Sequence, residues 1–134
     1  MDSLAREYAD QAHFLFIYTR EAHPDMYPDH PAHQTLEQKF QHARDLQKKF
    51  DTPRTILIDT LDGDVHRAWS GLSNMSWIID HTGYITYKAA WTSATHVRGA
   101  LDYTIRSRDL KRPRSGSAPF YQETVMWTVP RQEG

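Results

Sequence analysis

The sequence contains no cysteine. A chain without cysteine forms no disulfide, offers no thiolate nucleophile, and holds neither a zinc–cysteine site nor an iron–sulfur cluster. Glycine is also scarce, at 6 of 134 residues, and no phosphate-binding G-x-G-x-x-G loop is present. The sequence therefore excludes several large classes of redox and nucleotide-binding proteins.

The chain also lacks an excess of charge of either sign. Its 16 Lys and Arg residues stand against 17 Asp and Glu residues, so no overall field attracts nucleic acid or an anionic membrane. No apolar run approaches the roughly 20 residues that a membrane-spanning helix needs. Residues 1–20 show no basic–apolar–small signal pattern, and Asp2 and Glu7 interrupt them. We therefore expect a cytoplasmic protein that binds neither nucleic acid nor membrane.

The residues that are present alternate between helical and strand patterns. Continuous apolar runs at 13–19 and 55–60 predict strands buried on both faces. Between them, the capping-box pair Thr35 and Gln38 and an apolar stripe at helical spacing predict a helix over 35–50. The stripe consists of Leu36, Phe40, Ala43, Leu46 and Phe50. The other predicted elements are a short helix at 2–11, a helical turn at 65–69, a hairpin of strands 76–80 and 84–88, and a last helix capped by Ser93 or Thr95.

Strands that alternate with helices predict an α/β sandwich. A strand, a hairpin and a helix in succession, after an earlier crossover, form the arrangement that ends thioredoxin-like folds. Residues 111–119 are rich in proline, serine, glycine and arginine, which is typical of a linker. We therefore expect a domain over residues 1–110, a linker over 111–119, and a C-terminal strand or arm over 120–130.

A more specific pattern lies in the first predicted strand. Residues 14–24 read Phe-Leu-Phe-Ile-Tyr-Thr-Arg-Glu-Ala-His-Pro, a string that resembles the iodothyronine deiodinase family, whose members have a thioredoxin-like fold. Further segments match the family in order, so that the resemblance covers roughly residues 1–108. These segments are His33-Gln34 with Leu36-Glu37, Ile58-Asp59-Thr60 with Ala68-Trp69, the hairpin from Trp77 to Tyr87, and the helix from Val97 to Tyr103.

The resemblance implies a reductive enzyme with a selenocysteine or cysteine nucleophile just after the family's first core strand. That strand and the start of the following helix are missing here, and residues 2–11 resemble the rest of the helix. We therefore expect a mixed sheet without its N-terminal core strand, and a chain that is inactive as a reductase. Two origins fit this expectation: a reading frame that starts downstream of a selenocysteine codon, or a gene that lost its nucleophile.

A missing central strand leaves backbone groups unpaired, each at a cost of about 1–3 kcal/mol if buried without water. The apolar segment at residues 120–129, from Phe120 to Val129, is the candidate within the chain to replace it. We expect this segment to pair in the sheet or to cross to a second subunit of a homodimer.

The resemblance also implies site residues. It carries over Tyr18, Glu21, His23 and His33 as proton-handling and substrate-gripping side chains. Glu21 and His23, two residues apart at a strand end, point to one face, where the carboxylate can fix the tautomer of the imidazole. We expect Glu21, His23 and His33 to be catalytic, and Tyr18 and Trp91 to contact a small-molecule substrate.

Trp91 ends the segment Lys88-Ala89-Ala90-Trp91. Vertebrate members of the family place an arginine that grips the iodothyronine in this region. The arginine is not matched here, so the resemblance makes thyroid hormone a poor candidate substrate.

Two other functions stay open. One is a non-enzymatic binding or assembly module on a thioredoxin scaffold. The other is a metal-dependent enzyme built on His23, His30 and His33, since imidazoles are ligands of transition metals. This His-rich loop is a weak metal pattern, so we predict no metal and no cofactor. The remaining histidines show no spacing that chemistry needs, and we expect them at the surface or in structural roles: His13, His42, His66, His81 and His96.

Overall fold

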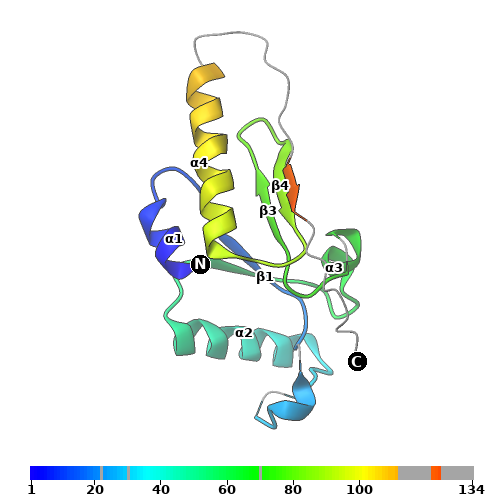
Figure 1. The fold of residues 1–134 in the computed structure, drawn as a ribbon. Helices are drawn as coiled ribbons and strands as arrows, with labels where there is room; N and C mark the ends of the chain where they lie inside the picture. The colour runs from blue at the N-terminus through cyan, green and yellow to red at the C-terminus, as the bar shows by residue number, and fades with distance from the viewer. Residues whose placement is uncertain (22, 30, 70, 112–121, 125–134) are drawn as a thin grey trace, which may run out of the picture. The chain divides into compact units, whose positions relative to one another are not determined.

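The computed structural model describes residues 1–21, 23–29, 31–69, 71–111 and 122–124 (Figure 1). The chain divides into two compact units, residues 1–73 and 74–134. The predicted domain over residues 1–110 spans both units. Lys111, the first residue of the predicted linker, ends a helix, and the rest of the linker lies outside the described residues.

The first unit is built on two parallel strands joined by a helical crossover. β1 (Leu15–Tyr18) pairs with β2 (Thr55–Ile58) in a register that sets Leu15 opposite Thr55 and Tyr18 opposite Ile58. Parallel neighbours need such a long connection because a tight turn cannot bring the chain back in the same direction. The connection contains the 3₁₀ helix η1 (Pro24–Met26) and α2 (Leu36–Phe50). Two short helices complete the unit, α1 (Asp2–Glu7) and α3 (Asp64–Trp69).

The sequence correctly predicts both ends of α2. The Thr35 hydroxyl accepts the Gln38 backbone N–H at 3.2 Å, and the Gln38 side chain accepts the Thr35 backbone N–H at 3.2 Å, which completes the capping box. The helix ends at Asp51, whose φ of 44° lies in the left-handed region. The buried face shares only Ala43 with the predicted stripe and also includes Lys39. Lys39 and Ala43 are the residues of α2 that are buried, while three of the stripe residues are exposed: Leu36, Phe40 and Phe50.

Polar contacts fix α1 to the strand-bearing part of the unit. The Asp2 carboxylate accepts hydrogen bonds from Thr52 Oγ1 at 2.7 Å and from Arg54 Nε at 2.7 Å. The hydrogen bond from Thr52 lowers the pKa of Asp2, and Arg54 acts in the same direction, while burial opposes both. On the inner side of α1, Leu4 and Ala5 are buried.

The second unit contains the predicted hairpin and last helix. β3 (Ser76–Ile79) and β4 (Ile85–Ala89) are antiparallel, and the turn between them has Gly83 at a φ of 88°. The Asp80 carboxylate accepts the Thr82 and Tyr84 backbone N–H groups, which closes the turn. α4 (Ala94–Lys111) begins directly after Ser93, one of the two predicted caps. Its inner residues Val97, Ala100 and Leu101 are buried, as are Tyr87 and Ala89 of β4.

Part of the C-terminal segment does join a sheet. Residues 122–124 form β5 (Gln122–Thr124), which pairs parallel to β4 on the edge opposite β3. The rest of the predicted strand over 120–130 lies outside the described residues. The described strands therefore form two separate sheets, ordered β1-β2 and β3-β4-β5, and β5 does not pair with β1 or β3. For these residues, the expectation that the tail pairs in a sheet is confirmed, and within the described residues they form one edge of the three-stranded sheet.

The element order confirms the predicted fold class. Helices and strands alternate, a parallel pair comes first, and an antiparallel hairpin followed by a helix comes last. This mixed α/β arrangement is compatible with a thioredoxin-like fold. Within the part of the chain that the structure describes, no helix has the length and apolar character to span a bilayer.

Candidate functional site

Three segments of the first unit bring one carboxylate and two imidazoles together. Glu21 follows the end of β1, His33 precedes the cap of α2, and His42 lies within α2. One possible ligand atom from each of the three lies within 4.8 Å of the other two. All three side chains are partly buried, so the group is only partly accessible to solvent. We call Glu21, His33 and His42 the carboxylate–histidine cluster.

The carboxylate of Glu21 is the centre of this cluster. The hydroxyl of Tyr18, a residue only 4% exposed, donates a hydrogen bond to Glu21 Oε1. His42 Nδ1 lies 3.4 Å from the same oxygen, and the side chains of His42 and Glu21 are 13% and 23% exposed. One carboxylate oxygen therefore accepts a hydrogen bond from Tyr18 and lies within ion-pair distance of a histidine on another element.

The aromatic rings of the site also contact one another. The Tyr18 and His33 ring centroids are 5.9 Å apart with the planes tilted by 47°, and the His33 and His42 centroids are 6.1 Å apart with an edge-on angle of 69°. These separations are within the range in which rings attract through edge and face. Packing thus restrains His33 between a buried tyrosine and the second imidazole.

The surroundings of His33 favour its neutral form. Burial is the main cause that lowers the pKa of His33, and the charge of Lys39 and the neighbouring His42 act in the same direction. Glu21 and the Thr19 backbone oppose them without reversing the shift. A neutral imidazole has one N–H hydrogen-bond donor and one lone pair, so His33 can accept a proton at its lone pair while its N–H donates a hydrogen bond.

A buried lysine lies next to the cluster on α2. Lys39 is 0% exposed and donates from Nζ to the Thr60 carbonyl at 2.8 Å. Burial lowers the pKa of Lys39, and the charge of Asp59 acts against that shift. The lysine therefore joins α2 to the chain segment that follows β2.

Asp59 in turn fixes that segment. Its carboxylate, 2% exposed, accepts the backbone N–H groups of Thr60, Val65 and His66 at 2.8–3.0 Å, and so caps α3. Burial acts to raise the pKa of Asp59, but these N–H donors and the Lys39 charge outweigh it and the pKa is lowered. Asp59 is thus an ionised structural group.

The structure places the predicted site residues unevenly. Tyr18, Glu21 and His33 come together as one group. His23 is exposed and is not part of the carboxylate–histidine cluster. Trp91 lies in the second unit and is 56% exposed. The catalytic and substrate-binding roles of all five remain predictions.

His42 is the site residue that sequence reasoning missed. We expected it at the surface or in a structural role, but its side chain is only 13% exposed and points to Glu21. The signal that could have found it is helical spacing, since His42 lies three residues after the buried Lys39 and next to the buried Ala43. The sequence alone does not predict that this face is buried, because a lysine is normally solvent-exposed.

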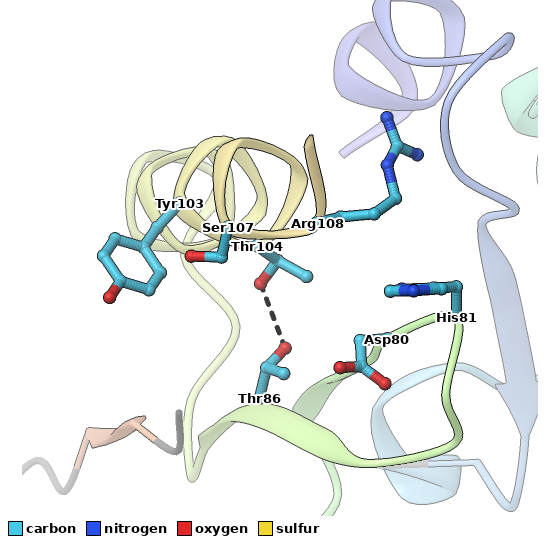
Figure 2. A pocket seen from close by; sticks show the side chains of 7 residues that line it. All are labelled: Asp80, His81, Thr86, Tyr103, Thr104, Ser107 and Arg108. Atoms are coloured by element: carbon cyan, nitrogen blue, oxygen red, sulfur yellow. Dashed lines mark hydrogen bonds between the residues drawn. The ribbon is translucent and has the colours of Figure 1, made fainter. Parts of the chain in front are cut away.

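The second unit has a hollow between β4, the hairpin turn and α4 (Figure 2). Thr86 Oγ1 and Thr104 Oγ1 share a hydrogen bond of 3.0 Å across it. The Asp80 carboxylate already accepts a backbone N–H group of the hairpin turn. Arg108 donates from Nε to Asp109. The hollow therefore offers less chemistry than the cluster of the first unit. Its lining residues are Asp80, His81, Thr86, Tyr103, Thr104, Ser107 and Arg108.

Comparison with known proteins supports the resemblance read from the sequence. The sequence model of the iodothyronine deiodinase family matches residues 1–102, a range that includes Tyr18 and all members of the carboxylate–histidine cluster. No curated protein and no solved structure matches the chain. The family match covers well over half of the 134 residues. The chain therefore belongs to the iodothyronine deiodinase family and is a deiodinase-like protein of the redox type.

Proposed function

We propose that this chain keeps a proton-handling site of its family but carries out no reductive dehalogenation by itself. One observation supports the first half of the proposal above all others: Tyr18 and His42 both reach one oxygen of Glu21, with His33 beside them. The second half follows from composition, since the chain contains no cysteine.

Reductive dehalogenation needs both a proton and electrons, and the two have different sources. Replacing a carbon–halogen bond by a carbon–hydrogen bond consumes two electrons and one proton and releases a halide ion. An imidazole that has taken up a proton from solvent can deliver it, and a neighbouring carboxylate stabilises that protonated form. The electrons must come from a thiolate or selenolate, which no residue of this chain provides. The site can thus bind and protonate, while the reduction itself requires a nucleophile from outside the chain.

The substrate part of the proposal concerns small aromatic molecules. The family motif carries Tyr18, and its hydroxyl bonds the Glu21 carboxylate, the group that a phenol hydroxyl would meet at this site. We propose Tyr18 as a substrate contact on this basis. Trp91 stays a proposal from the sequence alone, with its exposed indole as its only supporting feature.

The test is a halide-release assay on the full chain. The protein is incubated with iodinated and brominated phenols and excess dithiothreitol, and free halide is measured against a reaction without protein. We expect no protein-dependent release, together with phenol binding that Glu21→Gln weakens in a calorimetric titration. Halide release that depends on the protein and is lost in Glu21→Gln would show that the chain is a complete reductase.

A second candidate function is assembly. Parallel pairing of β5 with β4 leaves β1, β2, β3 and β5 as edge strands within the described residues, and edge strands present unpaired backbone groups to other chains. We propose that these edges support a homodimer. Light scattering coupled to size-exclusion chromatography tests this, with a mass near twice the 15.7 kDa of the chain expected for the dimer. A single monomer mass across the concentration range would rule the dimer out.

A further inference from the structure

We propose that the carboxylate–histidine cluster of Glu21, His33 and His42 is a binding site for a divalent transition-metal ion. The site differs from the loop set His23, His30 and His33 that the sequence offers. It shares only His33 with that set, and it takes its other ligands from the end of β1 and from α2.

The spacing of the ligand atoms is the first support. Two ligands about 2.1 Å from one tetrahedral zinc ion lie about 3.4 Å apart. His42 Nδ1 and Glu21 Oε1 are already separated by 3.4 Å. One possible ligand atom from each of the three residues lies within 4.8 Å of the other two, so His33 can supply the third ligand.

The chemistry of the donors is the second support. Two imidazoles with one carboxylate suit zinc and iron(II), and three protein ligands leave coordination positions open for water or a small oxygen donor. Nδ1 of His33 is buried and has no hydrogen-bond partner among the described residues. A buried polar nitrogen without a partner is uncommon, and coordination to a metal ion would satisfy it.

The surrounding residues hold the ligands in place. The Tyr18 hydroxyl donates to the Glu21 carboxylate and so orients it, which is the usual role of groups behind a metal ligand. His42 is carried by a helix whose start is fixed by the Thr35 capping box. Two of the three ligands are therefore positioned before any ion binds, which favours affinity.

One nearby cation opposes a metal ion. Lys39 acts electrostatically on His33, so its charge lies within reach of the cluster. Its ammonium group is directed to the Thr60 carbonyl at 2.8 Å, and the charge of Asp59 offsets it. Glu21 adds a negative charge inside the cluster itself, which leaves the site suited to a cation.

Titration of the untagged full chain with Zn²⁺ by calorimetry, and with Co²⁺ by visible absorption, tests the proposal. We expect one ion per chain, a rise in melting temperature with Zn²⁺, and cobalt bands that report nitrogen and oxygen ligands. Because the loss of a group behind a ligand already lowers metal affinity about 10–100-fold, His42→Ala should weaken binding by more than about tenfold. Absence of saturable binding to the wild-type chain would overturn the proposal.

Matched variants separate this site from other histidines. His13→Ala removes an exposed histidine before β1, and His23→Ala removes a histidine of the predicted loop set. Both should bind Zn²⁺ as the wild type does. Equal weakening by His42→Ala and His13→Ala, or loss of binding in His23→Ala with none in His42→Ala, would refute the site. Glu21→Gln keeps the size of the side chain and provides the same test if His42→Ala fails to fold. Metal binding and halide release are independent readouts, so each proposal can fail alone.

Discussion

Nδ1 of His42 lies 3.4 Å from Oε1 of Glu21, although the two residues come from the middle of a helix and the end of a strand. The parallel pairing of β1 and β2 makes this contact possible, because the crossover between them returns α2 to the end of β1 from which Glu21 continues. The capping box fixes where α2 starts and therefore which residues of the helix face the strands. A family motif and a residue outside it thus meet in one site.

Tyr18→Phe should destabilise the first unit. Tyr18 is only 4% exposed, and its hydroxyl donates a hydrogen bond to the Glu21 carboxylate. The substitution removes this hydroxyl and keeps the ring. A hydrogen bond to a charged group contributes about 1.5–3 kcal/mol to stability. We therefore expect the free energy of local unfolding of β1 and α2 to fall by about that amount. Amide hydrogen exchange of β1 and α2 measures it. Tyr84→Phe, at a 59% exposed tyrosine, is the control, and equal losses in both variants would contradict the assigned bond.

Asp59→Asn should loosen α3 and the segment after β2. The carboxylate accepts three backbone N–H groups in a buried position, and an amide offers one oxygen in place of two. We expect a loss of about 1–2 kcal/mol, as for a helix cap. Hydrogen exchange at Val65 and His66 measures it. Asp62→Asn changes an exposed neighbour, and a similar effect there would show that the cap is not the cause.

The lowered pKa of Asp59 also predicts that the stability of the fold depends on pH in the acidic range. The folded-state pKa of Asp59 is below the ordinary value of 3.8, so the folded state favours the ionised form. Its contribution is complete above that ordinary value and is lost as the pH falls through the lowered folded-state pKa. Urea unfolding between neutral and strongly acidic pH should therefore show a steeper acid loss for the wild type than for Asp59→Asn. Parallel pH curves would contradict this role.

Asp2→Ala should release α1. The Asp2 carboxylate is the common acceptor of Thr52 and Arg54, which lie just before β2, and Arg6 of the same helix donates to the Asp51 carbonyl nearby. A loss of about 1–2 kcal/mol is expected from removing a charged acceptor at a partly exposed site. Limited proteolysis should then cut the chain between α1 and β1 sooner than in Asp10→Ala, a change at an exposed aspartate. Unchanged cleavage would show that the other contacts of α1, the Arg6–Asp51 pair and the buried Leu4 and Ala5, are enough to hold the helix.

Local chemistry made much of the fold predictable. The capping box fixed the start of α2, the glycine of the hairpin marked the turn at Gly83, and short apolar runs marked β1 and β2. The buried face of α2 was not predictable in the same way. Lys39 reads as a solvent-exposed residue, and only the acceptor Thr60 and the charge of Asp59, which lie on a distant segment, explain its burial.

The residues of the candidate site also differ in how far the sequence predicts them. The family resemblance predicts Tyr18, Glu21 and His33 as site residues. His42 was missed, since its partner is fixed by the tertiary crossover and not by local spacing. His23, two residues from Glu21, was expected on the same face, yet it is exposed at the start of η1. The alternation of a strand does not continue there because β1 ends at Tyr18.

The most direct test of the connected group Tyr18, Glu21, His33 and His42 is the ring ¹⁵N–¹H spectrum of the histidines in the wild type and in Glu21→Gln. Each imidazole reports its tautomer and hydrogen bonding through the shifts of its two nitrogens. The structure predicts that Glu21→Gln changes the ring signals of His33 and His42 and leaves those of His13 and His23 unchanged. Unaltered His33 and His42 signals in a folded variant would contradict the site.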